Sequence, residues 1–211
     1  YRNKLEFTFS SKRWLLKGED IESVPENDRM GLGFHVGKFF DKVLDIKHCY
    51  LQKDPSNDIR LFIKKYAVEN GLDFFDIRQN VGYVRNMFIR TTDTGDLMVI
   101  MCFFYENRED REKMLDAIAE AFPQITSLYY IINNKLNDSI GDQECILYKG
   151  EPTIRETMES LTFRIGPKSF YQTNSEQAYK LYSVARDFAE LTGNEIVYDL
   201  YTGTGTIAQF V

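Results

Sequence analysis

The sequence predicts an α+β fold in two parts: an antiparallel-sheet domain with helices over residues 1–165, and the opening of a second, incomplete domain over residues 166–211. Three observations support this prediction. Short segments alternate between apolar and polar residues, as half-buried strands do, and turn-length gaps join several of them into hairpins. Two longer segments carry apolar residues at helical spacing. Gly166 and Pro167 together mark the boundary, since both residues interrupt regular structure.

The first third of the chain alternates strands with loops before its first helix. Residues 5–9 and 33–36 alternate with period two and are expected to form half-buried strands. Residues 17–30 are acidic and contain glycine and proline, which favours a loop or a hairpin tip. Residues 58–69 place apolar side chains at helical spacing, and the Asn70–Gly71 pair is typical of a helix C-terminus.

The middle of the chain predicts a hairpin, a second helix and further strands. Residues 81–91 and 97–105 flank the turn sequence 92–96 and are expected to pair antiparallel. An amphipathic helix is predicted over residues 109–122, where Pro123 stops it. Further strands are predicted at residues 127–133, 144–148, 153–156 and 159–165.

The second part begins with a helix and ends with a strand tip. Asn174 can cap a helix with Gln177 three residues later, a capping-box arrangement. Gly193 and Asn194 end this helix, and residues 196–198 are expected to form a strand with Asp199 at its carboxyl end. The apolar stripe expected on the helix consists of Ala178, Leu181, Ala185, Phe188 and Ala189.

A glycine turn follows Asp199 and leads into a second helix. Gly203 and Gly205 permit close approach of the backbone to a ligand, and residues 206–208 begin to form a helix. With Ala208 the turn satisfies a relaxed G-x-G-x-x-A pattern, so a seat for S-adenosylmethionine, a seat for a dinucleotide and a purely structural turn all stay open on the motif alone. One strand cannot complete a Rossmann-like sheet, so we expect the chain to be a fragment of a longer protein.

Composition and cysteine content favour a cytoplasmic protein with one good core. Of 211 residues 43% are hydrophobic, yet there is no apolar run of about 18 residues and no signal peptide, so no membrane span is expected. The cysteines Cys49, Cys102 and Cys145 are widely separated and odd in number, which fits reduced thiols better than a disulfide framework.

Charge is unevenly distributed along the chain. The net charge of −6 argues mildly against nucleic acid as a partner, because phosphate contacts need lysine and arginine. Residues 1–14 and 74–91 are nevertheless locally basic, whereas residues 15–29, 105–124 and 138–160 are acidic. One basic face for RNA is therefore a hypothesis, and ordinary solvated surface is its alternative. The candidate RNA contacts on that face are Arg2, Lys4, Arg13, Arg78, Arg85 and Arg90.

Several motifs taken together resemble a known family. Phe170, Gln172 and Asn174 form an F-x-Q-x-N motif, followed about 25 residues later by the sequence DLYTGTG at residues 199–205. This pair resembles the RNA 5-methyluridine (uracil-5-) methyltransferases. Residues 1–4 and 45–49 also look like the central region of that family, in particular its branch acting on 23S ribosomal RNA, which carries an iron–sulfur cluster.

The resemblance implies roles for individual residues. Gln172 becomes a contact for S-adenosylmethionine, and Phe170 would lie near the target base, which must leave the RNA stack to be reached. Arg2 and Lys4 are kept as RNA contacts on the basic charge of residues 1–14. Cys49 matches the isolated fourth cysteine ligand of a [4Fe-4S] cluster, whose other three ligands would lie upstream of Tyr1. The remaining cofactor contacts implied are Asp199, Tyr201, Gly203, Gly205 and Thr206. For the residues around Gln172 the structural alternative is a turn in which Asn174 caps the helix and Phe170 packs.

The chemistry that the family performs needs two groups that this chain does not supply. A cysteine thiolate adds to C6 of uracil and makes C5 nucleophilic, and a carboxylate base later removes the C5 proton. In the family both groups follow the glycine loop, so we expect them beyond Val211 and expect the fragment to be inactive. Cys102 lies in an apolar strand that would raise its pKa, and Cys145 follows Glu144, which also disfavours a thiolate. Two alternatives to a methyltransferase stay open: a non-catalytic RNA-binding module, and a nicotinamide or flavin oxidoreductase that uses the G-x-G-x-x-A turn.

Overall fold

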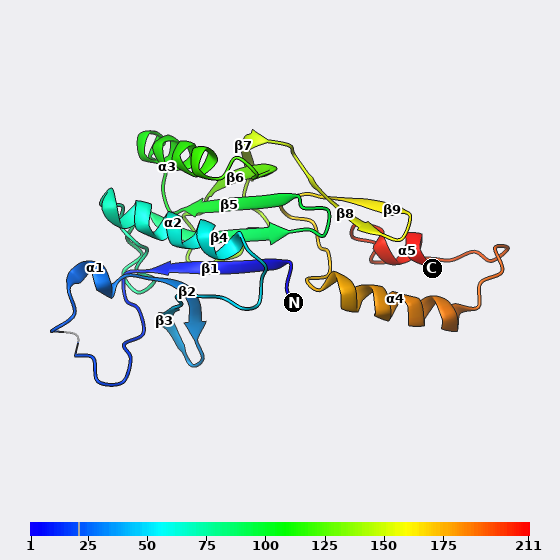
Figure 1. Ribbon diagram of the computed structural model, residues 1–211, viewed down its shortest axis with the longest axis horizontal. Helices are drawn as coiled ribbons and strands as arrows, with labels where there is room; N and C mark the ends of the chain where they lie inside the picture. Colours follow the sequence, from blue (N-terminus) through cyan, green and yellow to red (C-terminus); the bar gives the residue numbers. More distant parts are fainter. Residues whose placement is uncertain (21) are drawn as a thin grey trace.

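The computed structural model describes residues 1–20 and 22–211, and its centre is a seven-stranded sheet. The strands lie in the order β3-β2-β1-β4-β5-β6-β7 (Figure 1). Their bounds are β1 Lys4–Ser10, β2 Gly31–Val36, β3 Phe39–Asp45, β4 Val84–Thr91, β5 Leu97–Phe103, β6 Ser127–Ile132 and β7 Ile146–Gly150. The α+β class predicted from alternating segments is therefore confirmed.

The prediction of an antiparallel sheet is wrong at one pair of strands. β5 runs parallel to β6, while the other neighbouring pairs of this sheet are antiparallel. A parallel pair needs a crossover connection, and the helix α3 (Arg108–Ala121) provides it. Two further elements were not expected from the sequence: strand β3, and the short helix α1 (Glu26–Arg29) inside the predicted loop 17–30. Residue 21 of that loop lies outside the described residues.

The first hydrophobic core lies between the sheet and two helices on one of its faces. Helices α2 (Ser56–Glu69) and α3 lie side by side on that face in Figure 1. Alternate strand residues such as Leu5, Phe7 and Phe9 point into this core and meet Ile63 of α2 and Leu115 of α3. This pattern is the one that period-two alternation predicts, since successive side chains of a strand point to opposite faces.

The second core lies on the opposite face of the sheet. A separate hairpin of β8 (Ile154–Met158) and β9 (Leu161–Ile165) packs there together with α4 (Ser175–Ala189) and α5 (Thr206–Phe210). Phe88 of β4 and Ile100 of β5 share this core with Tyr182 of α4 and Phe210 of α5. Buried side chains of α4 and α5 thus pack against the large sheet, and Figure 1 shows these helices at one end of the molecule.

Two predictions for the second part are wrong. Residues 196–198 form no strand, because no other strand of the described chain lies beside them to share a ladder; Ile196 and Tyr198 are exposed. The predicted stripe of α4 is not its buried face either. Only Ala178 of that stripe is buried, together with Tyr182, whereas Leu181 and Phe188 are exposed.

Candidate cofactor and RNA site

The glycine loop has the backbone conformation that its sequence predicts. Gly203 and Gly205 have φ angles of 55° and 74°, in the left-handed region. A Cβ on Gly205 would lie 2.9 Å from the side-chain nitrogen of Gln209, which is the end of a flexible side chain and can move, so glycine is favoured there by its φ. The hydroxyl of Thr202 donates to the carbonyl oxygen of Asp199 at 2.6 Å, which closes the turn in front of the loop. The loop therefore has a defined backbone conformation and leads directly into α5.

The loop lies beside the F-x-Q-x-N segment. The hydroxyl of Thr204 donates to the carbonyl oxygen of Phe170 at 3.3 Å and lies 2.7 Å from the hydroxyl of Thr206. Phe170 itself is 70% exposed, so its ring is free to meet a planar ligand. Two motifs that are more than thirty residues apart in sequence are therefore in direct contact.

The side chain of Gln172 faces α4. Burial raises the pKa of Tyr182 on that helix, and the neighbouring Gln172 side chain acts in the opposite direction. The link between the two motifs thus runs through the Phe170 carbonyl and Thr204, while the Gln172 side chain lies near the Tyr182 hydroxyl. Asn174 caps α4 by accepting from the backbone N–H of Gln177 at 3.0 Å, which confirms the predicted helix start.

The other predicted cofactor contacts lie on an open surface. Tyr201 is 97% exposed and Gly203 is exposed, while Asp199 is half-buried and accepts from the backbone N–H of Tyr201 at 3.3 Å. Thr206 is buried at the start of α5. These residues offer a backbone ridge, a carboxylate and hydroxyls of the kind that hold an amino-acid or ribose group, and so they fit one side of a seat for S-adenosylmethionine.

A cleft of about 530 Å³ lies beside residues 173–177, at the end of the F-x-Q-x-N segment. Arg2 lines this cleft with Lys53, against the acidic Asp93 and Glu176. Lys4 is directed elsewhere: it is half-buried on the sheet face that carries the second core, and burial followed by the nearby Arg90 lowers its pKa. The two basic residues near the N-terminus that were expected to contact RNA therefore line different parts of the surface.

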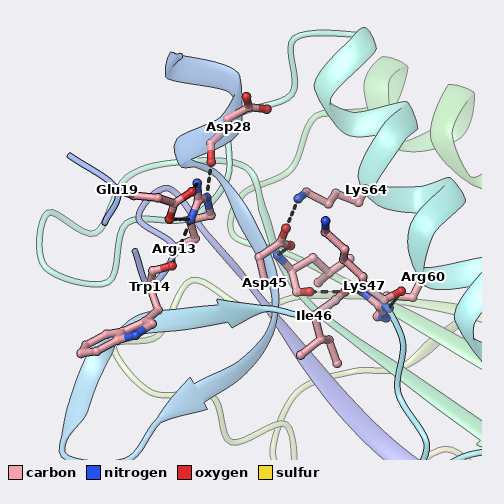
Figure 2. A network of polar contacts seen from close by, with 10 residues as sticks. Arg13, Trp14, Glu19, Asp28, Asp45, Ile46, Lys47, Arg60 and Lys64 are labelled. Atoms are coloured by element: carbon pink, nitrogen blue, oxygen red, sulfur yellow. Dashed lines mark hydrogen bonds and ion pairs between the residues drawn. The ribbon is translucent and has the colours of Figure 1, made fainter. Parts of the chain in front are cut away.

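The predicted basic face is wrong for two of its six residues, and two others are paired with acids. Arg85 and Arg90 are buried, so neither side chain can reach a phosphate on RNA. Arg13 is exposed in part but bonds both oxygens of Glu19 at 2.7 and 2.8 Å, as Figure 2 shows. The side chain of Arg78 pairs with Asp41 at 2.5 Å. A count of charges along the sequence cannot reveal burial or ion pairing, because the residues that surround these arginines come from other parts of the chain.

Cys49 is buried, and hydrogen bonds to residues of α2 hold its loop in place. Its backbone N–H donates to the side-chain oxygen of Asn57 at 2.7 Å. Arg60, also on α2, donates to the carbonyls of Ile46 and Lys47 at 2.6 and 3.2 Å, just before this cysteine (Figure 2). In the described chain no group of three or more potential metal ligands gathers around it. One thiol does not supply the four ligands of a [4Fe-4S] cluster, so the residues present do not fit that group.

The other two cysteines are poor nucleophiles. Burial strongly raises the pKa of Cys102, with the nearby Glu6 as the next cause, which confirms the expectation from its apolar strand. Burial also raises the pKa of Cys145. Both thiols are therefore held in the neutral form at physiological pH, and neither has the activated character that an attack on uracil needs.

Three residues near this site were not predicted from the sequence to support the F-x-Q-x-N segment. Asn3, Arg90 and Glu156 all hydrogen bond to residues of the segment from Ser169 to Ser175. Only Glu156 gave a signal that could have been used, because an acid in the middle of a short strand is unusual. For the other two the contact depends entirely on tertiary packing.

No model of a known protein family matches the chain. Individual proteins do. The chain is 59% identical over its full length to an uncharacterized RNA methyltransferase of Porphyromonas gingivalis and 55% identical to another of Bacteroides thetaiotaomicron. A third, from Chlorobaculum tepidum, is 34% identical. The matched regions make up 46%, 47% and 44% of these proteins, so the chain spans about half the length of the curated relatives it matches.

A solved structure is also similar. It is the crystal structure of the tRNA (uracil-54, C5)-methyltransferase of Pyrococcus abyssi in complex with S-adenosyl-L-homocysteine. The TM-score is 0.69 at 25% sequence identity, and the match covers 98% of this chain and 44% of that one. In the described residues no helix has the length and apolar character needed to cross a bilayer. Over its whole length the chain is thus homologous to somewhat less than half of several proteins that are named RNA methyltransferases.

Proposed function

We propose that these residues belong to an enzyme that methylates C5 of uracil in RNA with S-adenosylmethionine. The observation that carries the proposal is the contact between the glycine loop and the F-x-Q-x-N segment, made by Thr204 and the Phe170 carbonyl. The names of the relatives support RNA methylation, and the structural neighbour supports uracil C5 and the cofactor, since it is a uracil-C5 methyltransferase holding S-adenosyl-L-homocysteine.

We propose that residues 166–211 open the methyltransferase domain and that residues 1–165 serve RNA binding. Apolar side chains of residues 196–201 and of α4 are exposed, as expected of surfaces that pack against more of a Rossmann-like domain. S-adenosylmethionine, when bound, supplies an electrophilic methyl group. The chain contributes the orienting groups: the Gln172 amide, which lies near Tyr182, and the backbone of Gly203 and Gly205.

Phe170 is assigned to the target base. Its exposed ring lies next to the loop through its own carbonyl, so a base stacked on it would sit beside the cofactor seat. A base removed from its stack exchanges stacking on neighbours for stacking on this ring. Ribosomal RNA is the substrate we propose, on the resemblance of residues 45–49; transfer RNA, as named for the structural neighbour, is the competing substrate.

The chain by itself is proposed to be inactive. The chemistry needs a reactive thiolate, whereas Cys102 and Cys49 are buried and burial raises the pKa of Cys145. Binding of S-adenosylmethionine to the chain alone should also be weak, because Tyr201 and Gly203 present an open surface instead of an enclosed pocket.

The test is nucleoside analysis of RNA treated with the full-length protein and S-adenosylmethionine. Mass spectrometry should detect 5-methyluridine, and mapping on ribosomal and transfer RNA added separately identifies the substrate. The Gln172→Ala variant should form much less product at limiting cofactor. The absence of 5-methyluridine from both RNAs, with a protein that binds the cofactor, would remove the proposal.

A further inference from the structure

The segment that carries Phe170 and Gln172 is held in place by the large sheet. Arg90, on β4, donates from both terminal nitrogens to the carbonyl oxygen of Ser169 at 3.2 Å each. Asn3, next to β1, donates its side-chain amide to the carbonyl oxygen of Gln172 at 3.1 Å and its backbone N–H to that of Thr173 at 2.6 Å. Backbone on both sides of Phe170 is thus tied to two neighbouring strands of the sheet.

Arg90 occupies an unfavourable place that these bonds explain. It is 5% exposed and lies directly opposite Lys4 in the β1–β4 ladder. Like charges directly opposite one another destabilise a sheet. Burial lowers the pKa of Arg90 to about 10. A buried guanidinium is retained where its hydrogen bonds are needed, and here two of them go to the residue that precedes Phe170.

Glu156 provides a second tie from the hairpin β8–β9. Its side chain is fully buried, and one carboxylate oxygen accepts from the backbone N–H groups of Asp93 and Thr157 at 3.1 and 3.2 Å. The other oxygen accepts from the hydroxyl of Ser175 at 3.1 Å, and that hydroxyl in turn accepts from the Asn3 amide at 2.9 Å. One carboxylate therefore joins the β4–β5 turn, the hairpin and the first turn of α4.

We propose that Asn3, Arg90 and Glu156 are positioning residues, which act through the backbone of residues 169–175 to hold Phe170 and Gln172 in one arrangement on the sheet. The roles of Phe170 and Gln172 rest on the function proposed above, whereas the restraint itself does not. The consequence is that the sheet domain and the segment facing base and cofactor form one body. Loss of one of these hydrogen bonds leaves the segment in several arrangements, and only a fraction of them can bind the base and the cofactor.

Hydrogen–deuterium exchange on the chain tests the restraint without any ligand. Ser175→Ala removes the relay between Asn3 and Glu156, and Arg90→Met removes both bonds to Ser169. Amides of residues 169–178 should exchange about tenfold faster in each, the factor that 1.4 kcal/mol makes in an equilibrium constant. Ser175→Thr keeps the hydroxyl and should restore the original rate. Arg155→Met is the matched control. Arg155 lies on the β8–β9 hairpin beside Glu156, and its replacement breaks an ion pair with Asp96 of the β4–β5 turn but should leave these amides unchanged.

A second measurement separates positioning from general stability. In the full-length protein Ser175→Ala should raise the Kd for S-adenosyl-L-homocysteine about tenfold while the Kd for RNA changes less than twofold. Unchanged exchange in both Ser175→Ala and Arg90→Met, with both proteins folded, would overturn the proposal. Failure of the wild-type enzyme to methylate RNA would instead overturn the proposed function and leave the exchange result standing.

Discussion

Replacement of Arg85 by methionine distinguishes a structural arginine from an RNA contact. The charge pattern of the sequence placed Arg85 on a basic RNA-binding face, but the structure buries its side chain completely. Its guanidinium donates to the carbonyls of Asn133 and Lys135 at 2.8 and 2.5 Å and to one oxygen of Asp138 at 3.1 and 2.9 Å. It also stacks over Phe75, with 4.5 Å to the ring centroid.

The magnitude follows from what the substitution leaves behind. Methionine fills much of the volume, but two carbonyls lose their donor and Asp138 loses its partner. Removing one member of a buried ion pair costs about 3–5 kcal/mol. Asp138 is about one third exposed, so water recovers part of this loss, and we expect the lower end, about 3 kcal/mol. At about 2–4 °C per kcal/mol for a chain of this size, Tm should fall by roughly 6–12 °C.

Denaturant unfolding followed by circular dichroism measures the free energy, and titration with RNA at several salt concentrations measures the electrostatic contacts. Arg85→Met should lower the unfolding midpoint and leave the salt slope unchanged, because a buried cation releases no counterions from RNA. Lys65→Met, which breaks an exposed pair with Glu69, should change stability by less than about 1 kcal/mol. A normal midpoint with a reduced salt slope would refute the structural assignment of Arg85.

Three further predictions concern pH, the glycine loop and the Gln172 side chain. Burial raises the pKa of Glu156 above 4.5, so the folded state binds its proton more tightly; stability should fall as pH rises above 4.5, and in Glu156→Gln urea titrations should show this fall reduced. Gly205→Ala and Gly203→Ala should each cost about 1–2 kcal/mol in unfolding free energy through their φ angles of 74° and 55°, and unchanged stability in both variants would contradict the argument from φ. Tyr182→Phe keeps the ring but removes the hydroxyl beside the Gln172 side chain, and calorimetry on the full-length protein should show a several-fold weaker Kd for S-adenosyl-L-homocysteine with little change in Tm; an unaltered Kd would show that this hydroxyl does not position Gln172.

Local signals were enough to predict much of the secondary structure. The strand at residues 5–9, the cap at Asn174 and the left-handed glycines at 203 and 205 all appear where short-range patterns put them. Each depends on a few neighbouring residues: alternation, a side-chain acceptor before a helix, or the absence of a Cβ.

Features that depend on distant partners were not predictable in the same way. The parallel pairing of β5 and β6 depends on the path of α3, and residues 196–198 form no strand because a strand needs a neighbour to bond. Likewise the hydrogen bonds of Arg90 to Ser169 join residues 79 positions apart. Two candidate RNA contacts, Arg85 and Arg90, are buried, so their side chains stabilise the fold instead.

Calorimetric titration of S-adenosyl-L-homocysteine into the full-length protein and its Gln172→Ala variant tests most directly whether the F-x-Q-x-N segment and the glycine loop form one seat for the methyl donor. The wild-type protein should bind, and the variant should bind at least tenfold more weakly with its Tm retained, because loss of one well-placed polar contact costs about 1–3 kcal/mol. Equal affinity of the two proteins, or no binding by a folded wild-type protein, would contradict the assignment.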